Sequence, residues 1–170
     1  HDYVSVLGYA SSKDGYSVDE KLDTPIYHPR EYFEFVGEEV AADPSKVAMK
    51  YMSGGGYGGC EDPRLTLIDG KVYMTYVAFD GINPPRVALT SIELENFLSK
   101  NWQWERPVLI SPPDVVDKNA VIFPEKVQGK YVIMHRIFPD ILIDSVDSLN
   151  FDGTSWLEGG HKIMPRPDKW

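Results

Sequence analysis

The sequence is poor in cysteine and histidine and has no long hydrophobic segment. Cys60 is the single cysteine in 170 residues, which excludes an internal disulfide framework. With no recognisable leader, a free cysteine favours a cytoplasmic location. The four histidines are scattered without the spacing of a metal site. No apolar run approaches the ~20 residues that a membrane-spanning helix needs. We therefore expect a protein without disulfides, without a bound metal and without a membrane span.

Basic residues are also fewer than acidic ones. The chain has 17 Lys and Arg against 26 Asp and Glu, a net charge of −9. This balance disfavours nucleic acid or an anionic membrane as a general partner, although a local basic cluster can still bind a small anion. A length of 170 residues and a hydrophobic share of 42% suit a single domain with a real core.

A glycine-rich stretch precedes two acids, a proline and an arginine. Residues 54–64 read GGGYGGCEDPR and contain five glycines, which let a backbone pass close to a ligand. Pro63 fixes its own φ and biases Asp62 toward extended geometry. We expect Asp62 at a stiff corner where a loop enters a strand, with its carboxylate aimed at a substrate. The alternative is a solvent-exposed turn whose acidic residues have no functional role.

Strand signals dominate the rest of the chain and predict an all-β fold. The clearest is a hairpin of residues 65–68 and 71–79 around Asp69-Gly70, and Gln128-Gly129 centres a second one. One helical turn is expected over 93–98, and a short helix or irregular insertion over 38–52. Further strands are expected over residues 3–10, 32–36, 86–91, 107–110, 120–123 and 141–145. The tail from residue 159 has no clear periodicity.

The two hairpins look like copies of one unit. Residues 68–76, IDGKVYMTY, resemble residues 127–135, VQGKYVIMH, and each copy is followed by a loop, a strand and a turn containing serine. A four-stranded unit that repeats every several tens of residues is typical of a β-propeller. A β-sandwich with similar hairpins is the alternative.

In a propeller, loops and strand ends from several blades meet at one mouth, where sites form. The polar residues at strand ends are Asp62, Arg64, Arg86, Arg106, Lys118, Asn119, His135 and Arg136. Together they predict a cationic pocket that faces one acid, which suits a small oxyanion and a group that needs a proton. Taken singly, a histidine at position 135 is more often a satisfied structural residue, and Lys118 is an ordinary surface lysine.

Several motifs resemble those of glycoside hydrolase family 130, the β-mannoside phosphorylases and β-1,2-mannosidases. The resemblance extends from residue 4 to about residue 156. It is carried by GCEDPR at 59–64, YMTY at 73–76, RVAL at 86–89, KNAVIFPEK at 118–126 and GKYVIMHR at 129–136. It implies a five-bladed β-propeller. Residues 1–170 would then form a partial catalytic domain of two to three blades, about half of the fold.

The resemblance also implies a role for each candidate residue. Asp62 matches the general acid, whose proton in the phosphorylases passes through a hydroxyl of the mannose. Arg86, Lys118 and His135 match phosphate-binding positions, as does Arg106. Arg64, Asn119 and Arg136 are the expected substrate-binding residues. Many phosphorylases have Lys-Asp where this chain has Lys118-Asn119, which leaves the substrate open.

The expected function is that of an inverting phosphorylase that releases mannose 1-phosphate. Its substrate would be a manno-oligosaccharide or a mannosyl-glucose, with inorganic phosphate as co-substrate and no resident cofactor. A β-mannoside hydrolase, expected in the periplasm, is an alternative that needs a second carboxylate ~6.5–9.5 Å away; Asp114, Asp117 and Glu125 are candidates. A non-catalytic carbohydrate-binding module is the third. Half a propeller leaves sheet edges uncovered, which predicts low stability or a homo-oligomer.

Overall fold

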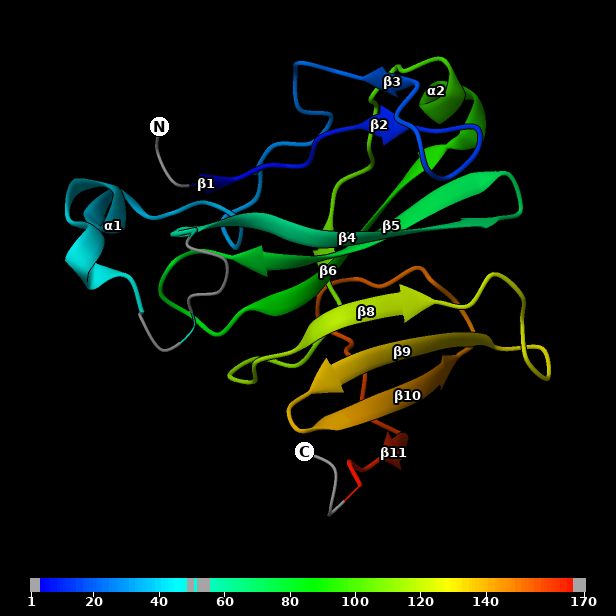
Figure 1. Cartoon of the computed structure of the whole chain (residues 1–170). Coiled ribbons are helices and arrows are strands. Elements are labelled where there is room, and N and C mark those ends of the chain that lie inside the picture. The colour runs from blue at the N-terminus through cyan, green and yellow to red at the C-terminus, as the bar shows by residue number, and fades with distance from the viewer. Residues whose placement is uncertain (1–3, 49–50, 52–55, 167–170) are drawn as a thin grey trace.

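Two β-sheets, one above the other, form the body of the molecule in a computed structural model that describes residues 4–48, 51 and 56–166 (Figure 1). The first sheet has the order β1 (Val4–Ser5), β4 (Gly58–Ile68), β5 (Lys71–Phe79), β6 (Arg86–Glu93) and β7 (Val108–Leu109). The second has the order β11 (His161–Ile163), β10 (Asp140–Val146), β9 (Tyr131–Ile137) and β8 (Lys118–Ile122). All neighbours pair antiparallel except β1 and β4, which are parallel.

The remaining elements are short. They are the pair β2 (Ala10–Ser11) and β3 (Glu20–Lys21), the helices α1 (Glu38–Ala42) and α2 (Leu94–Leu98), and a 3₁₀ turn over Pro44–Lys46. Among the described residues, no helix is long and apolar enough to cross a membrane. The chain is thus mostly β, as the strand signals predict.

Both predicted hairpins are present, and their turns have the same conformation. Asp69 and Gly70 have φ values of 50° and 80°, and Gln128 and Gly129 have 52° and 81°. Two consecutive positive φ values are typical of a type I′ turn, whose twist matches that of the flanking strands. The second residue of each turn is glycine, which adopts this conformation without steric strain.

The first strand of each hairpin carries a β-bulge. In the first sheet Glu61 pairs with Val77 and Arg64 with Thr75, so two residues of β4 face Tyr76 alone. Asp62, the first of these two, has φ 51°. The expectation of extended geometry at Asp62 is therefore wrong, because the bulge requires a left-handed residue there, and aspartate is among the residues that tolerate this conformation.

The second sheet repeats this feature. Lys118 pairs with Arg136 and Val121 with Met134, so two residues of β8 face His135 alone. The first of them, Asn119, has φ 59°. The sequence repeat aligns residue 76 with residue 135, and the structure places both opposite a bulge. The repeat predicted from the sequence is confirmed and extends to the bulged strand before each hairpin.

Three segments differ from their predictions. The strand expected over residues 3–10 is broken, with β1 in the first sheet and Ala10 in the pair of β2 and β3. Residues 32–36 form a turn instead of a strand, because Glu34 is buried and binds the backbone of its own turn. The tail, which showed no periodicity, contributes β11 to the edge of the second sheet. Residues 49–50 and 52–55, which include the start of the glycine run, lie outside the described part of the chain.

Apolar side chains form two main clusters on opposite faces of the first sheet. One contains Met74, Tyr76 and Trp104 and covers the outer face. The other contains Val87 and Leu89 of β6 with Ile122 and Ile133 of the second sheet, so it lies between the two sheets. Side chains of a strand point alternately to its two faces, and this sheet therefore buries both of them.

Glu34 connects the turn of residues 31–35 to the first sheet. Its side chain is fully buried and accepts hydrogen bonds from the Tyr27 hydroxyl at 2.9 Å, from the Tyr76 hydroxyl, and from the backbone N–H groups of Arg30 and Glu31 at 2.7 and 2.8 Å. Burial raises the pKa of Tyr76, so this hydroxyl remains a donor. A buried carboxylate is tolerated when its oxygens are satisfied by donors in this way.

Removing this carboxylate should strongly destabilise the fold. We expect Glu34→Ala to lower the free energy of unfolding by about 3 kcal/mol or more, because several buried donors lose their acceptor. The exposed Glu38→Ala is the control and should change it by less than about 0.5 kcal/mol. Urea denaturation followed by circular dichroism measures both, and equal midpoints would contradict the role of Glu34.

Candidate active site

Two threonine side chains fix the second sheet against the first at the level of the bulges. The Thr75 hydroxyl of β5 donates to the carbonyl of Ala120, in the bulge of β8, at 2.6 Å. The Thr66 hydroxyl of β4 donates to the carbonyl of Ile122 at 2.9 Å. Thr75 also pairs with Arg64 at the end of the bulge in β4. The two bulges therefore lie on either side of Thr75.

This arrangement brings predicted site residues from the two sheets to one region. Asp62 and Arg64 come from the bulge of β4, and Lys118 and Asn119 from that of β8. Arg86 begins β6. It pairs with Ala78 of β5, which pairs in turn with Cys60 of β4, so Arg86 and Cys60 are two strands apart. Two strand spacings put the α-carbons of Arg86 and Cys60 about 10 Å apart. Figure 1 shows that β4, β6 and β8 run in the same general direction.

Asp62 is exposed at a cavity of about 470 Å³ that is lined by residues 5–8 and 60–63. The wall formed by β1 approaches closely, because a Cβ on Gly59 would lie 2.3 Å from the carbonyl oxygen of Ser5. Ser5 also donates to Glu61 at 3.0 Å. Glu61 and Asp62 both line the cavity, and Glu61 is also engaged with β1.

Arg64 supports the bulge that carries Asp62. Its guanidinium Nη1 donates to the carbonyl oxygens of Asp62 and Pro63, both at 3.1 Å. Carbonyls within a bulge lose their regular ladder partners, so an arginine that binds them stabilises the local conformation. Arg64 is exposed like Asp62.

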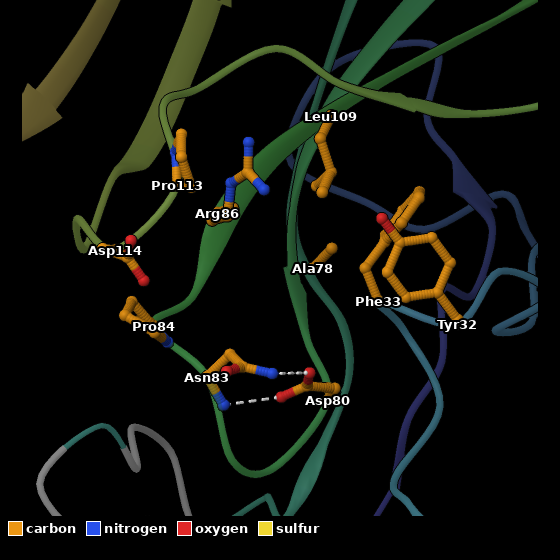
Figure 2. Close-up of a pocket in the computed structure, with 10 residues that line it drawn as sticks. All are labelled: Tyr32, Phe33, Ala78, Asp80, Asn83, Pro84, Arg86, Leu109, Pro113 and Asp114. Carbon is orange, nitrogen blue, oxygen red and sulfur yellow. Dashed lines mark hydrogen bonds between the residues drawn. The ribbon is translucent and has the colours of Figure 1, made fainter. Parts of the chain in front are cut away.

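Arg86 lines a separate, smaller pocket of about 160 Å³. Figure 2 shows Arg86 and Asp114 on one side of this pocket and Tyr32 on the other. The Arg86 Nε donates to the carbonyl of Ser111 at 3.1 Å, and Nη2 binds the same oxygen. Burial lowers the pKa of Arg86, and the charges of Tyr32, Asp114 and Asp117 oppose this shift. A guanidinium stays protonated at neutral pH, so the pocket contains a half-buried positive charge.

Lys118 and Asn119 are partly buried at the start of β8. The side-chain oxygen of Asn119 is buried and has no hydrogen-bond partner among the described residues, and the same holds for Oδ1 of Asp117. A buried polar atom without a partner is costly. The region beside this bulge therefore contains two buried oxygen atoms for which the described residues supply no hydrogen-bond donor.

His135 lies beneath the bulge of β8 and has carboxylate partners on both ring nitrogens. Nδ1 is 2.7 Å from Asp117 and Nε2 is 2.8 Å from Asp144. Burial alone lowers the pKa of His135, but the hydrogen bonds and charges of the two aspartates outweigh it, so the pKa is raised. The expectation was a phosphate ligand, whereas here the ring is fully engaged and 1% of the residue is exposed.

Asp144 extends this network to the far edge of the second sheet. Its carboxylate accepts hydrogen bonds from the backbone N–H groups of Glu158, Gly159 and Gly160 at 3.0–3.2 Å. Successive backbone N–H groups form an anion-binding concavity. His135 thus connects the segment before β11 with Asp117, the residue that precedes the bulge of β8.

Of the other predicted residues, Arg106 lies apart from this group, whereas Arg136 lies directly opposite Lys118. Arg106 is largely exposed and forms two hydrogen bonds with Glu31, at 2.9 and 3.0 Å. These bonds lower the pKa of Glu31. Arg136 is exposed on β9, in register with Lys118. The candidate second acids also separate: Asp117 is buried against His135, Asp114 lies in the pocket of Arg86, and Glu125 is exposed.

Several residues that organise the site were not predicted to do so. Thr75 belongs to the YMTY motif, which gives it no separate role, and the sequence suggests Asp117 only as a second carboxylate. Asp144 and Ser111 carry no sequence signal, because their partners are distant in sequence. Among the described residues, no group of three or more His, Cys, Asp or Glu has the geometry to hold a metal ion.

The raised pKa of His135 predicts a pH-dependent contribution to stability. The charged ring stabilises the fold fully below its ordinary pKa of about 6.5, and this contribution is lost as the pH rises through the raised value. The difference in unfolding free energy between the wild type and His135→Gln should therefore be largest near pH 6 and shrink toward pH 9. Urea titrations across this range measure it, with the exposed His161→Gln as control. A difference independent of pH would show that the ring is not charged.

Comparison with known proteins gives a consistent result. Residues 2–164 match the model of glycoside hydrolase family 130, described as beta-1,4-mannooligosaccharide phosphorylase. A 1,2-beta-oligomannan phosphorylase of Thermoanaerobacter sp. (strain X514) is 32% identical over 99% of this chain and 46% of its own length. A beta-1,2-mannobiose phosphorylase of the same organism is 35% identical over 84% of this chain and 38% of its own length.

A solved structure supports the fold. The beta-1,2-mannobiose phosphorylase from Listeria innocua, in complex with beta-1,2-mannobiose, superposes with a TM-score of 0.52 at 22% identity. The match covers 82% of this chain and 32% of that one. The chain thus spans less than half the length of these relatives. Because the family model matches nearly the whole chain, the chain belongs to glycoside hydrolase family 130.

Proposed function

We propose that the protein containing this chain is an inverting phosphorylase that cleaves β-mannosides with inorganic phosphate and releases mannose 1-phosphate. The family membership and the names of both curated relatives support this activity. The observation that carries the proposal is the junction at Thr75. There Thr75 lies between the bulge that carries an exposed acid, Asp62, and the bulge that directly follows Lys118.

In this proposal Asp62 is the general acid. A phosphate oxygen forms a bond to the anomeric carbon of the mannose while the bond from that carbon to the leaving oxygen breaks. The leaving oxygen receives the proton that originates from Asp62, through a hydroxyl of the mannose. The left-handed conformation of Asp62 and the bonds of Arg64 to the bulge hold the acid in place, and such positioning contributes directly to rate.

Phosphate needs binding more than activation, because it is already an anion. Arg86 and Lys118 supply positive charge from neighbouring strand ends. A guanidinium can bind two phosphate oxygens at once, which orients the nucleophile as well as holding it. Phosphate is the co-substrate in this proposal, and the sugar substrate is a manno-oligosaccharide or mannosyl-glucose. β-1,2-Mannobiose is the first to test, given the names of the relatives.

We also propose the five-bladed β-propeller as the fold of the whole protein. The two bulged units described above are equivalent to two of its blades. Sheet edges that this chain leaves open would be covered by the other blades or by a second copy of the chain.

A β-mannoside hydrolase is the second candidate. Asp114 favours it, because this carboxylate lies in the same pocket as Arg86 and has φ 62°. A water molecule activated there would replace phosphate. Turnover of β-1,2-mannobiose with and without phosphate separates the candidates: turnover that requires phosphate supports the phosphorylase, turnover in both conditions supports the hydrolase, and binding without turnover supports a carbohydrate-binding module.

Asp62→Asn should abolish phosphorolysis while the sugar still binds. The loss of a general acid is expected to lower kcat by about 10²–10⁴-fold. Asp69→Asn is a matched control, since Asp69 is also exposed and has a positive φ, at the other end of β4. Release of mannose 1-phosphate measures the rate, and calorimetric titration with β-1,2-mannobiose measures binding. Near-normal activity of Asp62→Asn would remove Asp62 from the mechanism.

Arg86→Gln should mainly weaken saturation by phosphate. Losing a charged hydrogen-bond donor of ~1.5–3 kcal/mol is expected to raise the KM for phosphate by about 10- to 100-fold, with a smaller effect on the KM for the sugar. Arg106→Gln in parallel decides whether Arg106, which pairs with Glu31, belongs to the phosphate site. An unchanged KM for phosphate in Arg86→Gln would argue against a phosphate at this residue.

A further inference from the structure

We propose that Thr75 is a positioning residue that sets the distance between the acid on β4 and the anion-binding side chains on β8. It does not touch the substrate itself. This inference rests on the proposed function, because it assigns a purpose to the junction between Asp62 and Lys118.

Thr75 is placed to act on both bulges at once. Its backbone pairs with Arg64, the residue that closes the bulge of β4. Its hydroxyl donates at 2.6 Å to the carbonyl of Ala120, inside the bulge of β8. Thr75 is 1% exposed and Ala120 is 4% exposed, so water does not compete for this bond.

The physical reason for a hydroxyl at this position follows from the bulge. An extra residue disrupts the ladder between β8 and β9 at Asn119 and Ala120, where regular backbone bonding is lost. A buried carbonyl there needs a donor from elsewhere. Thr75 supplies one from the other sheet, and so binds the irregular part of β8 to the first sheet.

Apolar packing between the sheets does not have this directionality. The apolar contacts around Val87 and Ile122 are non-directional, whereas a short hydrogen bond constrains distance and angle. A displacement of β8 by a fraction of an ångström would change where Lys118 lies relative to Asp62. Displacements near 1 Å are enough to lower rates by about 10²-fold.

Three variants of the intact protein test the proposal. Thr75→Val keeps the shape of the side chain and removes the hydroxyl. Thr75→Ser keeps the hydroxyl and removes the methyl group. Thr66→Val is the matched control, because it removes the same kind of bond to β8 at Ile122, outside the bulge.

Steady-state kinetics with β-1,2-mannobiose and inorganic phosphate give the first readout. We expect Thr75→Val to lower kcat/KM for phosphate by about 10- to 100-fold. Thr75→Ser and Thr66→Val should remain within about threefold of the wild type, even where thermal melting shows that both valine variants lose stability. Equal kinetic losses in the two valine variants, or no loss in Thr75→Val, would overturn the proposal.

Amide hydrogen exchange gives a readout independent of turnover. In Thr75→Val the segments 61–64 and 118–121 should both exchange faster than in Thr66→Val. In the unmodified protein, phosphate should slow exchange in both segments together, since Thr75 connects them, which tests the proposal even if Thr75→Val does not fold. Protection confined to residues 118–121 contradicts the coupling.

The two hypotheses fail in different ways. If the wild type neither turns over β-1,2-mannobiose with phosphate nor binds phosphate, the proposed function is wrong. The comparison of exchange between Thr75→Val and Thr66→Val then still decides whether Thr75 couples the two bulges. If the wild type is active and the two valine variants behave alike, the function stands and the positioning role is wrong.

Discussion

The arrangement of the site depends on hydrogen bonds from one sheet to the backbone of the next. The Thr75 hydroxyl of the first sheet donates to the carbonyl of Ala120 inside the bulge of β8. Thr66 adds a bond to the carbonyl of Ile122, outside the bulge. Hydrophobic packing between the sheets supplies most of the attraction, but it is non-directional and does not by itself fix the relative position of the strands. Directional bonds to backbone atoms set the level at which β8 lies against β4 and β5. Asp62 and Lys118 belong to different sheets, so in the proposed function this level determines whether they can act on one substrate.

Each bulge also lies over a buried polar group that supports it. Beneath the first, Tyr76 donates to the buried Glu34. Beneath the second, His135 lies between Asp117 and Asp144. Hydrogen bonds in a low-dielectric interior are directional and constrain an arrangement more strongly than apolar packing does, although Oδ1 of Asp117 has no partner among the described residues. The two repeated units thus share a β-bulge at the same position, but the polar side chains opposite the bulge differ.

Membership of glycoside hydrolase family 130 fits this division of labour. In the proposed phosphorylase, the reaction needs one acid and a cation that holds the phosphate, and the two bulged strands carry Asp62 and Lys118 for these roles. Arg86 adds positive charge from a third strand end, in a pocket of its own. His135 is buried, and both of its ring nitrogens are occupied by Asp117 and Asp144.

The sequence by itself determined the hairpins, their repetition, the mostly-β character and the family, because turn residues and strand periodicity act over a few neighbouring positions. Asp69-Gly70 and Gln128-Gly129 are examples. The left-handed conformation of Asp62 and the turn around Glu34 contradicted the local signals. Asp62 lies in a bulge opposite Tyr76, and Glu34 binds the backbone of its own turn while Tyr76 donates to it from β5. Only the tertiary structure decided that Thr75 joins the bulges and that His135 is enclosed by carboxylates. Those contacts join residues 9–45 positions apart, and no local pattern encodes a pairing that arises only when the sheets pack.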